Sequence, residues 1–165
     1  MTATRDSWES IPLGSTVPLA YSATFTADEA DLLRRGLVPG EMEDKWFIFW
    51  ECDSLFLHRS WTGQGVYQVD FRQAGNLLEV TRALVTVGTL HYRRGTDQDE
   101  VALLDFLIRG LLLHQAVAFP VPADAPMGEA PGLYQAHVTG TGYPERRLPR
   151  VRETWTAWLK RLLRR

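Results

Sequence analysis

Large apolar side chains are concentrated in one stretch of this 165-residue chain, between Trp46 and Leu57. The runs Trp46–Trp50 and Leu55–Leu57 are rich in the aromatic and aliphatic residues found in strands, and the polar pair Cys52-Asp53 lies between them. This pattern predicts a β-hairpin in which Cys52 and Asp53 are the two residues of the turn.

A two-residue turn also predicts which residues of the hairpin lie opposite each other. Glu51 then faces Ser54, and each step outward adds one pair until Lys45 faces Ser60. Side chains alternate between the two faces of a sheet. One face therefore holds the pairs Phe49–Phe56, Phe47–His58 and Lys45–Ser60, and the other holds Trp50–Leu55, Ile48–Leu57 and Trp46–Arg59. Because both faces carry large apolar groups, we expect the hairpin to be central in the sheet or covered on both sides.

Further strands are expected on both sides of the hairpin in the sequence. The runs Val66–Arg72 and Leu77–Val87 follow it after short glycine-bearing loops, and a short extended segment is expected around Leu19–Phe25. Residues 90–93 are a candidate extension of the sheet. Neighbouring strands joined by short loops favour an antiparallel meander, here of four to six strands.

Two helices are expected to flank this sheet. Thr26 and Glu29 form a capping-box pattern and Gly36 is a typical helix end, which predicts a helix over 27–35. Leucines at helical spacing predict a long helix over about 98–114, capped by Thr96 or Asp97 and largely buried against the sheet.

The C-terminal part of the chain has a different character. Residues 119–149 hold six of the nine prolines and predict a long irregular connection with one short strand at 134–138. An amphipathic helix is expected over about 151–164. The expected fold is α+β, with one domain over residues 1–149 and a basic C-terminal helix over 150–165 docked on it.

The formal charge of −2 conceals an asymmetry along the chain. Residues 1–144 carry 10 Lys/Arg and 18 Asp/Glu, a net charge of −8, whereas residues 145–165 carry 8 and 2, a net charge of +6. The acidic body argues against nucleic acid as a partner, and the basic helix is short and lacks an interleaved aromatic platform. A docked helix with a solvated basic face is the preferred interpretation. An arm that binds nucleic acid, an acidic partner or a membrane surface is the alternative.

Several classes of protein are excluded by what the sequence lacks. The single cysteine, Cys52, rules out an internal disulfide, no apolar run reaches the length of a membrane span, and the first residues do not resemble a signal peptide. We therefore expect a cytoplasmic chain. The four histidines have no metal-ligand spacing and no phosphate-binding glycine motif occurs, so neither a metal nor a cofactor is expected.

Residues capable of chemistry gather at the open end of the hairpin. They are Lys45, Trp46, His58, Arg59, Ser60, Trp61, Thr62 and Gly63. Lys45, His58 and Ser60 share a face and can all donate to phosphate or carboxylate oxygens, which indicates an anion site. Arg59 opposite Trp46 predicts a cation–π contact. In the structural alternative, a backbone carbonyl satisfies His58, Arg59 pairs with Asp70, and Trp61 fills the core.

The segments Met42–Glu51, Leu55–Gly63 and Val66–Val69 resemble an uncharacterised bacterial family with the signature EMEDKWFI…LxxHRSWTG. Some of its members are labelled as connected with ADP-ribosylation or as crystallin J1-like ADP-ribosylglycohydrolases. The resemblance implies that the hairpin-end residues, together with Tyr67, form a site for a nucleotide or ADP-ribose-like ligand. The acidic metal-binding motifs of those glycohydrolases are absent from this sequence, so neither their activity nor their magnesium sites are carried over.

Two classes of function remain open at this point. The first is a domain with a pocket for an anionic small molecule at the Lys45 and Ser60 end of the hairpin. The second is a non-enzymatic protein-interaction module, accessory or immunity-type, in which the same residues only stabilise the sheet. No reaction is assigned to either class.

Overall fold

The computed structural model describes residues 2–41 and 43–120 of the chain. Its sheet contains β1 (Thr16–Leu19), β2 (Thr24–Phe25), β3 (Trp46–Glu51), β4 (Ser54–Arg59), β5 (Gly65–Ala74) and β6 (Leu77–Thr86). The helices are α1 (Ala27–Arg35) and α2 (Asp97–Phe106), with the short helical segments η1 (Arg5–Ser7) and η2 (Leu107–Leu112). The predicted α+β class with an antiparallel sheet is confirmed.

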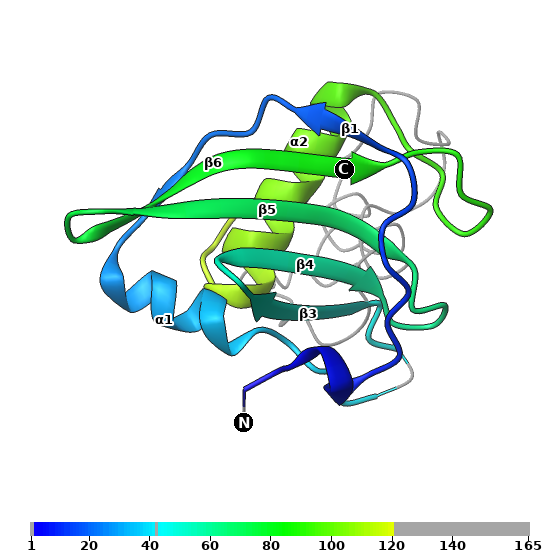
Figure 1. The fold of residues 1–165 in the computed structure, drawn as a ribbon, viewed down its shortest axis with the longest axis horizontal. Coiled ribbons are helices and arrows are strands. Elements are labelled where there is room, and N and C mark those ends of the chain that lie inside the picture. Colours follow the sequence, from blue (N-terminus) through cyan, green and yellow to red (C-terminus); the bar gives the residue numbers. More distant parts are fainter. Residues whose placement is uncertain (1, 42, 121–165) are drawn as a thin grey trace, which may run out of the picture.

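The strands follow the order β1-β6-β5-β4-β3, and β2 also pairs with β6. From β3 to β6 the chain forms the predicted meander, with each strand antiparallel to the next. Helix α2 crosses one face of the sheet, and the segment between η1 and β1 runs past the ends of β3, β4 and β5 (Figure 1). One end of the sheet is therefore enclosed by chain that precedes the hairpin by some forty residues.

Hairpin β3–β4 has the predicted register, from Glu51 opposite Ser54 to Trp46 opposite Arg59. Its turn residues Cys52 and Asp53 have φ values of 49° and 60°. Positive φ at both positions is what a type I′ turn requires, and Asn-Gly satisfies it better than Cys-Asp. The length of the turn determines the register, although the turn residues themselves are not the preferred ones.

Apolar side chains cover the hairpin on both faces, as the sequence predicts. On the α2 side, Trp46, Ile48, Leu55 and Leu57 belong to the main core, which also contains Tyr67, Val69, Val85, Leu104, Leu107 and Ile108. On the other side, Phe47 and Phe49 form a smaller cluster with Ala3, and Val38 and Phe56 pack against it. The N-terminal residues thus supply part of the second cover.

Helix α1 has the bounds and caps expected from the sequence. The Thr26 hydroxyl accepts a hydrogen bond from the N–H of Glu29 (3.4 Å), and the Glu29 carboxylate accepts one from the N–H of Thr26 (2.8 Å). Gly36 ends the helix at a φ of 66°, and a Cβ there would collide with the carbonyl oxygen of Ile48 on β3. Glycine is therefore required for the helix to end this close to the sheet edge.

The prediction of one long helix over 98–114 is correct only in part. The α-helix begins after the predicted cap Thr96, whose hydroxyl accepts from the N–H of Asp99 (3.2 Å), and it ends at Phe106. A π-helical segment follows, in which the N–H of Leu113 bonds to the carbonyl of Ile108, five residues back (3.1 Å). Apolar spacing does not distinguish the two helix types, because the leucines meet the core in both.

Four further predictions concern the rest of the chain. The strand at 134–138, the C-terminal helix at 151–164 and the boundary near residue 150 lie outside the described residues. Residues 90–93 do not extend the sheet; they belong to the loop that leads from β6 to α2. Among the described residues no helix combines the length and apolar character needed to cross a membrane.

Candidate functional site

The open end of the hairpin lies where β3 and β5 begin and β4 and β6 end (Figure 1). The sequence-predicted candidates all come from this end of the sheet: Lys45, Trp46, His58, Arg59, Ser60, Trp61, Thr62, Gly63 and Tyr67. The structure distributes them over three environments, which are the buried face under α2, the opposite face and a solvent-exposed rim.

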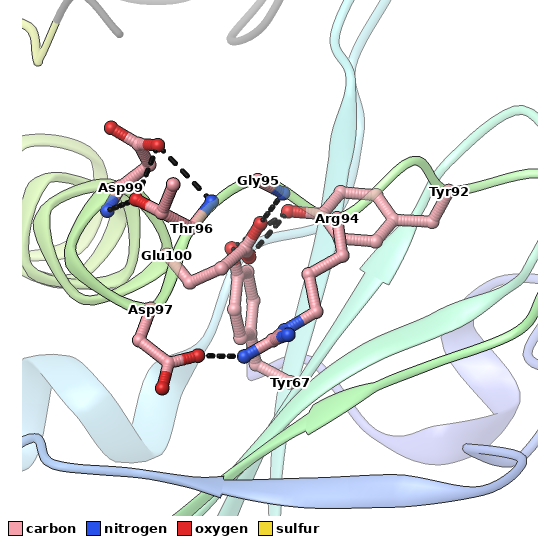
Figure 2. Close-up of polar contacts among 8 residues, drawn as sticks. All are labelled: Tyr67, Tyr92, Arg94, Gly95, Thr96, Asp97, Asp99 and Glu100. Carbon is pink, nitrogen blue, oxygen red and sulfur yellow. Dashed lines mark hydrogen bonds and ion pairs between the residues drawn. The ribbon is translucent and has the colours of Figure 1, made fainter. Parts of the chain in front are cut away.

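The environment under α2 is centred on the carboxylate of Glu100, which comes from the first turn of α2 and is 2% exposed. Its Oε2 accepts hydrogen bonds from the hydroxyls of Tyr67 (2.5 Å) and Tyr92 (2.7 Å), and its Oε1 accepts one from the N–H of Gly95 (2.6 Å). Figure 2 shows these groups converging on the carboxylate. We call Tyr67, Tyr92 and Glu100 the inner network; it connects β5, the β6–α2 loop and α2.

The electrostatics of the inner network suit a structural role. Burial raises the pKa of Tyr67 and of Tyr92 well above its ordinary value, and the charge of Glu100 contributes to the increase. Both hydroxyls therefore stay protonated and donate at neutral pH. A buried carboxylate that accepts three hydrogen bonds is well satisfied, so this arrangement is better suited to fastening α2 to the sheet than to exchanging protons with a substrate.

Two of the candidates, Trp46 and Arg59, pack beside the inner network. The Arg59 guanidinium lies 5.0 Å from the centroid of the Trp46 ring, which confirms the predicted cation–π contact, and Trp46 in turn stacks on Tyr67. Burial lowers the pKa of Arg59, although a guanidinium remains charged in proteins. The alternative pairing of Arg59 with Asp70 is wrong. Asp70 lies opposite Ser54, at the other end of β4, and its carboxylate accepts from Arg82 (2.6 Å).

His58 points to the opposite face of the hairpin, where it is 1% exposed and packs against the rings of Phe47 and Phe49. Its Nδ1–H donates to the carbonyl of Gly63 (2.8 Å), as the structural alternative expects. Among the described residues, no polar atom lies within hydrogen-bond distance of its Nε2. Burial lowers the pKa of His58, so the ring is neutral at neutral pH.

The remaining polar candidates have separate partners. The Ser60 hydroxyl donates to the carbonyl of Asp44 (2.5 Å), and the Thr62 hydroxyl accepts from a backbone N–H two residues further on (3.3 Å). Lys45 extends outward instead, with its Nζ 3.7 Å from the centroid of the Trp61 ring. The three groups expected to share an anion site, Lys45, His58 and Ser60, therefore each contact a different part of the chain.

Trp61 is 65% exposed, so the alternative in which it fills the core is wrong. Trp8 and Ile11, which are 40% and 44% exposed, flank the same loop. These three are among the four exposed large hydrophobic side chains of the described residues, and Leu90 is the fourth. We call Trp8, Ile11, Lys45 and Trp61 the aromatic rim.

Backbone and side-chain hydrogen bonds hold the aromatic rim in place. The Trp8 indole N–H donates to the carbonyl of Ser60 (2.8 Å), and the N–H of Ile11 donates to the carbonyl of Gly63 (2.7 Å). The carbonyl of Ile11 accepts from the N–H of Gly65 (2.9 Å), where a Cβ would approach Leu13 within 2.8 Å. The exposed side chains thus project from a fixed backbone.

Sequence reasoning missed four residues of these two regions. Glu100 lies in the first turn of α2 and precedes the buried Leu104 by four positions, which places it on the buried side of the helix. No pattern in the sequence around Tyr92 indicates that its side chain is partly buried. Trp8 and Ile11 lie in a polar segment that is predicted to be a loop. The sequence does not show which other residues an isolated apolar side chain in a loop lies beside.

Neither a metal site nor similarity to known proteins indicates what the chain does. Within residues 2–41 and 43–120 no three His, Cys, Asp or Glu side chains are grouped so that they could hold a metal ion. Comparison with protein-family models, with curated proteins and with solved structures finds no match. The functional interpretation therefore depends on the two regions described above.

Proposed function

We propose that this chain is a non-enzymatic interaction domain that binds a basic polypeptide segment through the aromatic rim. The observation that carries the proposal is the grouping of Trp8, Ile11 and Trp61 at one end of the sheet, exposed and on a fixed backbone. Tryptophan is enriched among the residues that dominate the binding energy of protein interfaces. Because the backbone that carries these side chains is already held by hydrogen bonds, binding orders less of the chain and costs less conformational entropy.

The partner's charge follows from the surroundings of the rim. Glu9 packs against Gly63 in the rim loop, and Glu43 and Asp44 directly precede Lys45 in the chain, so acidic residues adjoin the rim. Residues 2–41 and 43–120 together carry 10 Lys/Arg and 16 Asp/Glu. Charge complementarity steers association and disfavours partners of like charge, which selects a basic segment with apolar side chains.

A direct test uses two labelled peptides added to the full chain. One contains Arg, Leu and Trp, and the other has Glu at every Arg position. We expect micromolar binding of the basic peptide only, and a loss of about tenfold or more in affinity in the Trp8→Ala/Trp61→Ala double variant. Leu90→Ala is the matched control, because Leu90 is 98% exposed but belongs to the β6–α2 loop. Equal affinity for both peptides, or no effect of the double variant, would contradict the proposal.

An anionic ligand, nucleotide or ADP-ribose-like, is the second candidate function. It is favoured by one observation, the Lys45 ammonium 3.7 Å from the exposed ring of Trp61, since a cation beside an aromatic plane suits a phosphate attached to a ring. A thermal shift with ADP-ribose that disappears in Lys45→Ala and in Trp61→Ala would support it. A shift that persists in both variants would exclude this site.

A further inference from the structure

We infer that residues 145–165 of this same chain occupy the aromatic rim, so that an external basic segment has to displace them. The inference deepens the proposed function and rests on it for the chemistry of the surface. It concerns which segment the rim binds in the full chain when no other protein is present.

The charges of the two parts are complementary. Residues 145–165 carry 8 Lys/Arg against 2 Asp/Glu, whereas the described residues have an excess of six acidic side chains. Asp6 and Glu9, in the segment that carries Trp8, are exposed and add to the negative charge beside the rim. Opposite net charges on two parts of one chain attract each other, and the attraction weakens with salt.

The apolar content of the segment also matches the rim. Trp155, Trp158, Leu159 and Leu162 lie among its basic residues. The Nζ of Lys45 lies 3.7 Å from the centroid of the exposed Trp61 ring, so one cation–π contact at the rim is already made by the rim's own lysine. Arginines of residues 145–165 can make the same kind of contact with Trp8, and its tryptophans and leucines can cover Ile11 and Trp61.

The chain between the two parts is long enough for this contact. About 25 residues separate position 120 from position 145, and at about 3.3 Å per residue they can span roughly 80 Å. A folded domain of about 120 residues has a radius of gyration of about 14 Å. Because the segment is covalently attached, its effective concentration at the rim is of the order of millimolar, so even a weak contact is largely occupied.

The experiment uses the full chain with the photoreactive residue benzoylphenylalanine in place of Trp61. The control places it at Asn76, in the turn between β5 and β6 at the other end of the sheet. Irradiated monomer is digested and cross-linked peptides are identified by mass spectrometry. The comparison variants are Arg161→Glu/Arg164→Glu/Arg165→Glu, which reverses three charges, and the matched Arg161→Lys/Arg164→Lys/Arg165→Lys, which keeps them.

We expect cross-links from position 61, and not from position 76, to peptides of residues 145–165. Their yield should fall about tenfold in the Glu variant and in 1 M salt, where the Debye length is about 3 Å, and should persist in the Lys variant. The basic peptide added from outside should then bind about tenfold tighter to the Glu variant than to the native chain. Cross-links only between two copies of the chain, or none to residues 145–165, would overturn the inference.

The two proposals fail in different ways. If position 61 does not cross-link to residues 145–165 but the external basic peptide still binds in a manner that depends on Trp8 and Trp61, this inference is wrong and the proposed function stands. If the cross-links form but the external peptide does not bind even the Glu variant, the rim serves only its own chain and the proposed function is wrong.

Discussion

The inner network and the aromatic rim lie at the same end of the sheet, but they use their residues in opposite ways. In the inner network, polar groups are buried and satisfy one another around Glu100. In the aromatic rim, apolar groups are exposed although a core lies close by. His58 and Ser60, which suggest chemistry in the sequence, are buried and bonded to backbone carbonyls, whereas Trp61, which the structural alternative places in the core, is mostly exposed.

Because of this difference, substitutions can be chosen that affect either stability or binding rather than both. Changes in the inner network should alter the free energy of unfolding, and changes in the aromatic rim should alter the affinity for a partner.

Glu100→Ala should destabilise the fold by about 3–5 kcal/mol, because the hydroxyls of Tyr67 and Tyr92 and the N–H of Gly95 lose their acceptor in a buried site. Urea unfolding followed by circular dichroism measures the effect. Glu100→Gln keeps one acceptor oxygen and should cost less. A loss below about 1 kcal/mol from Glu100→Ala would show that the network does not fasten α2 to the sheet.

Acid should destabilise the protein through His58. Its pKa is lowered in the folded state, so the unfolded chain binds more protons below the ordinary value of about 6.5, and stability rises with pH across that range. The contribution is fully present above pH 6.5 and is lost toward lower pH with a slope of at most about 1.4 kcal/mol per pH unit.

The variant His58→Asn isolates this effect, since an amide keeps a donor for the carbonyl of Gly63 but does not titrate. Urea unfolding at a series of pH values from 7 to 5 should give a smaller slope for the variant than for the native chain. Identical slopes would mean that His58 does not titrate differently in the two states.

Replacing the hairpin turn by Cys52→Asn/Asp53→Gly should stabilise the fold by about 1 kcal/mol, because these residues adopt positive φ with less strain. The turn lies at the other end of the hairpin from both regions. The melting temperature should rise while the affinity for the basic peptide stays unchanged. A change in affinity would show that stability and binding are not separate in this molecule.

Trp61→Ala should change the free energy of unfolding by less than about 1 kcal/mol, since the ring is mostly exposed and its contact with Lys45 is a surface cation–π pair. Its effect should be seen in peptide binding instead. Thermal unfolding and fluorescence anisotropy on the same sample compare the two quantities. A loss of several kcal/mol would place Trp61 among the structural residues.

Local patterns predict the hairpin and α1 well. The break at residues 51–54 between two apolar runs indicates the turn, the turn determines the register, and every predicted pair from Glu51–Ser54 to Trp46–Arg59 is present. The capping box of α1 likewise involves residues only three positions apart. Such features depend on contacts close in sequence, so the alternation of residue types is sufficient to find them.

The two regions at the sheet end depend on contacts between distant residues. Tyr67 and Glu100 are 33 positions apart, and Trp8 reaches the carbonyl of Ser60 across 52 positions. The hairpin register places His58 and Lys45 on one face. It does not show that His58 is buried while Lys45 lies over the ring of Trp61. Which residues are covered is decided by tertiary packing, and the pattern of residue types does not contain that information.

The most direct test of the aromatic rim is nuclear magnetic resonance of the indole N–H groups while the basic peptide is added to the full chain. If the aromatic rim binds the peptide, the indole N–H signals of Trp8 and Trp61 should shift with peptide concentration. The signal of the buried Trp46 should stay in place. Shifts at Trp46 with Trp8 and Trp61 unaffected would contradict this prediction, because they would locate the binding site beside Arg59 and the inner network.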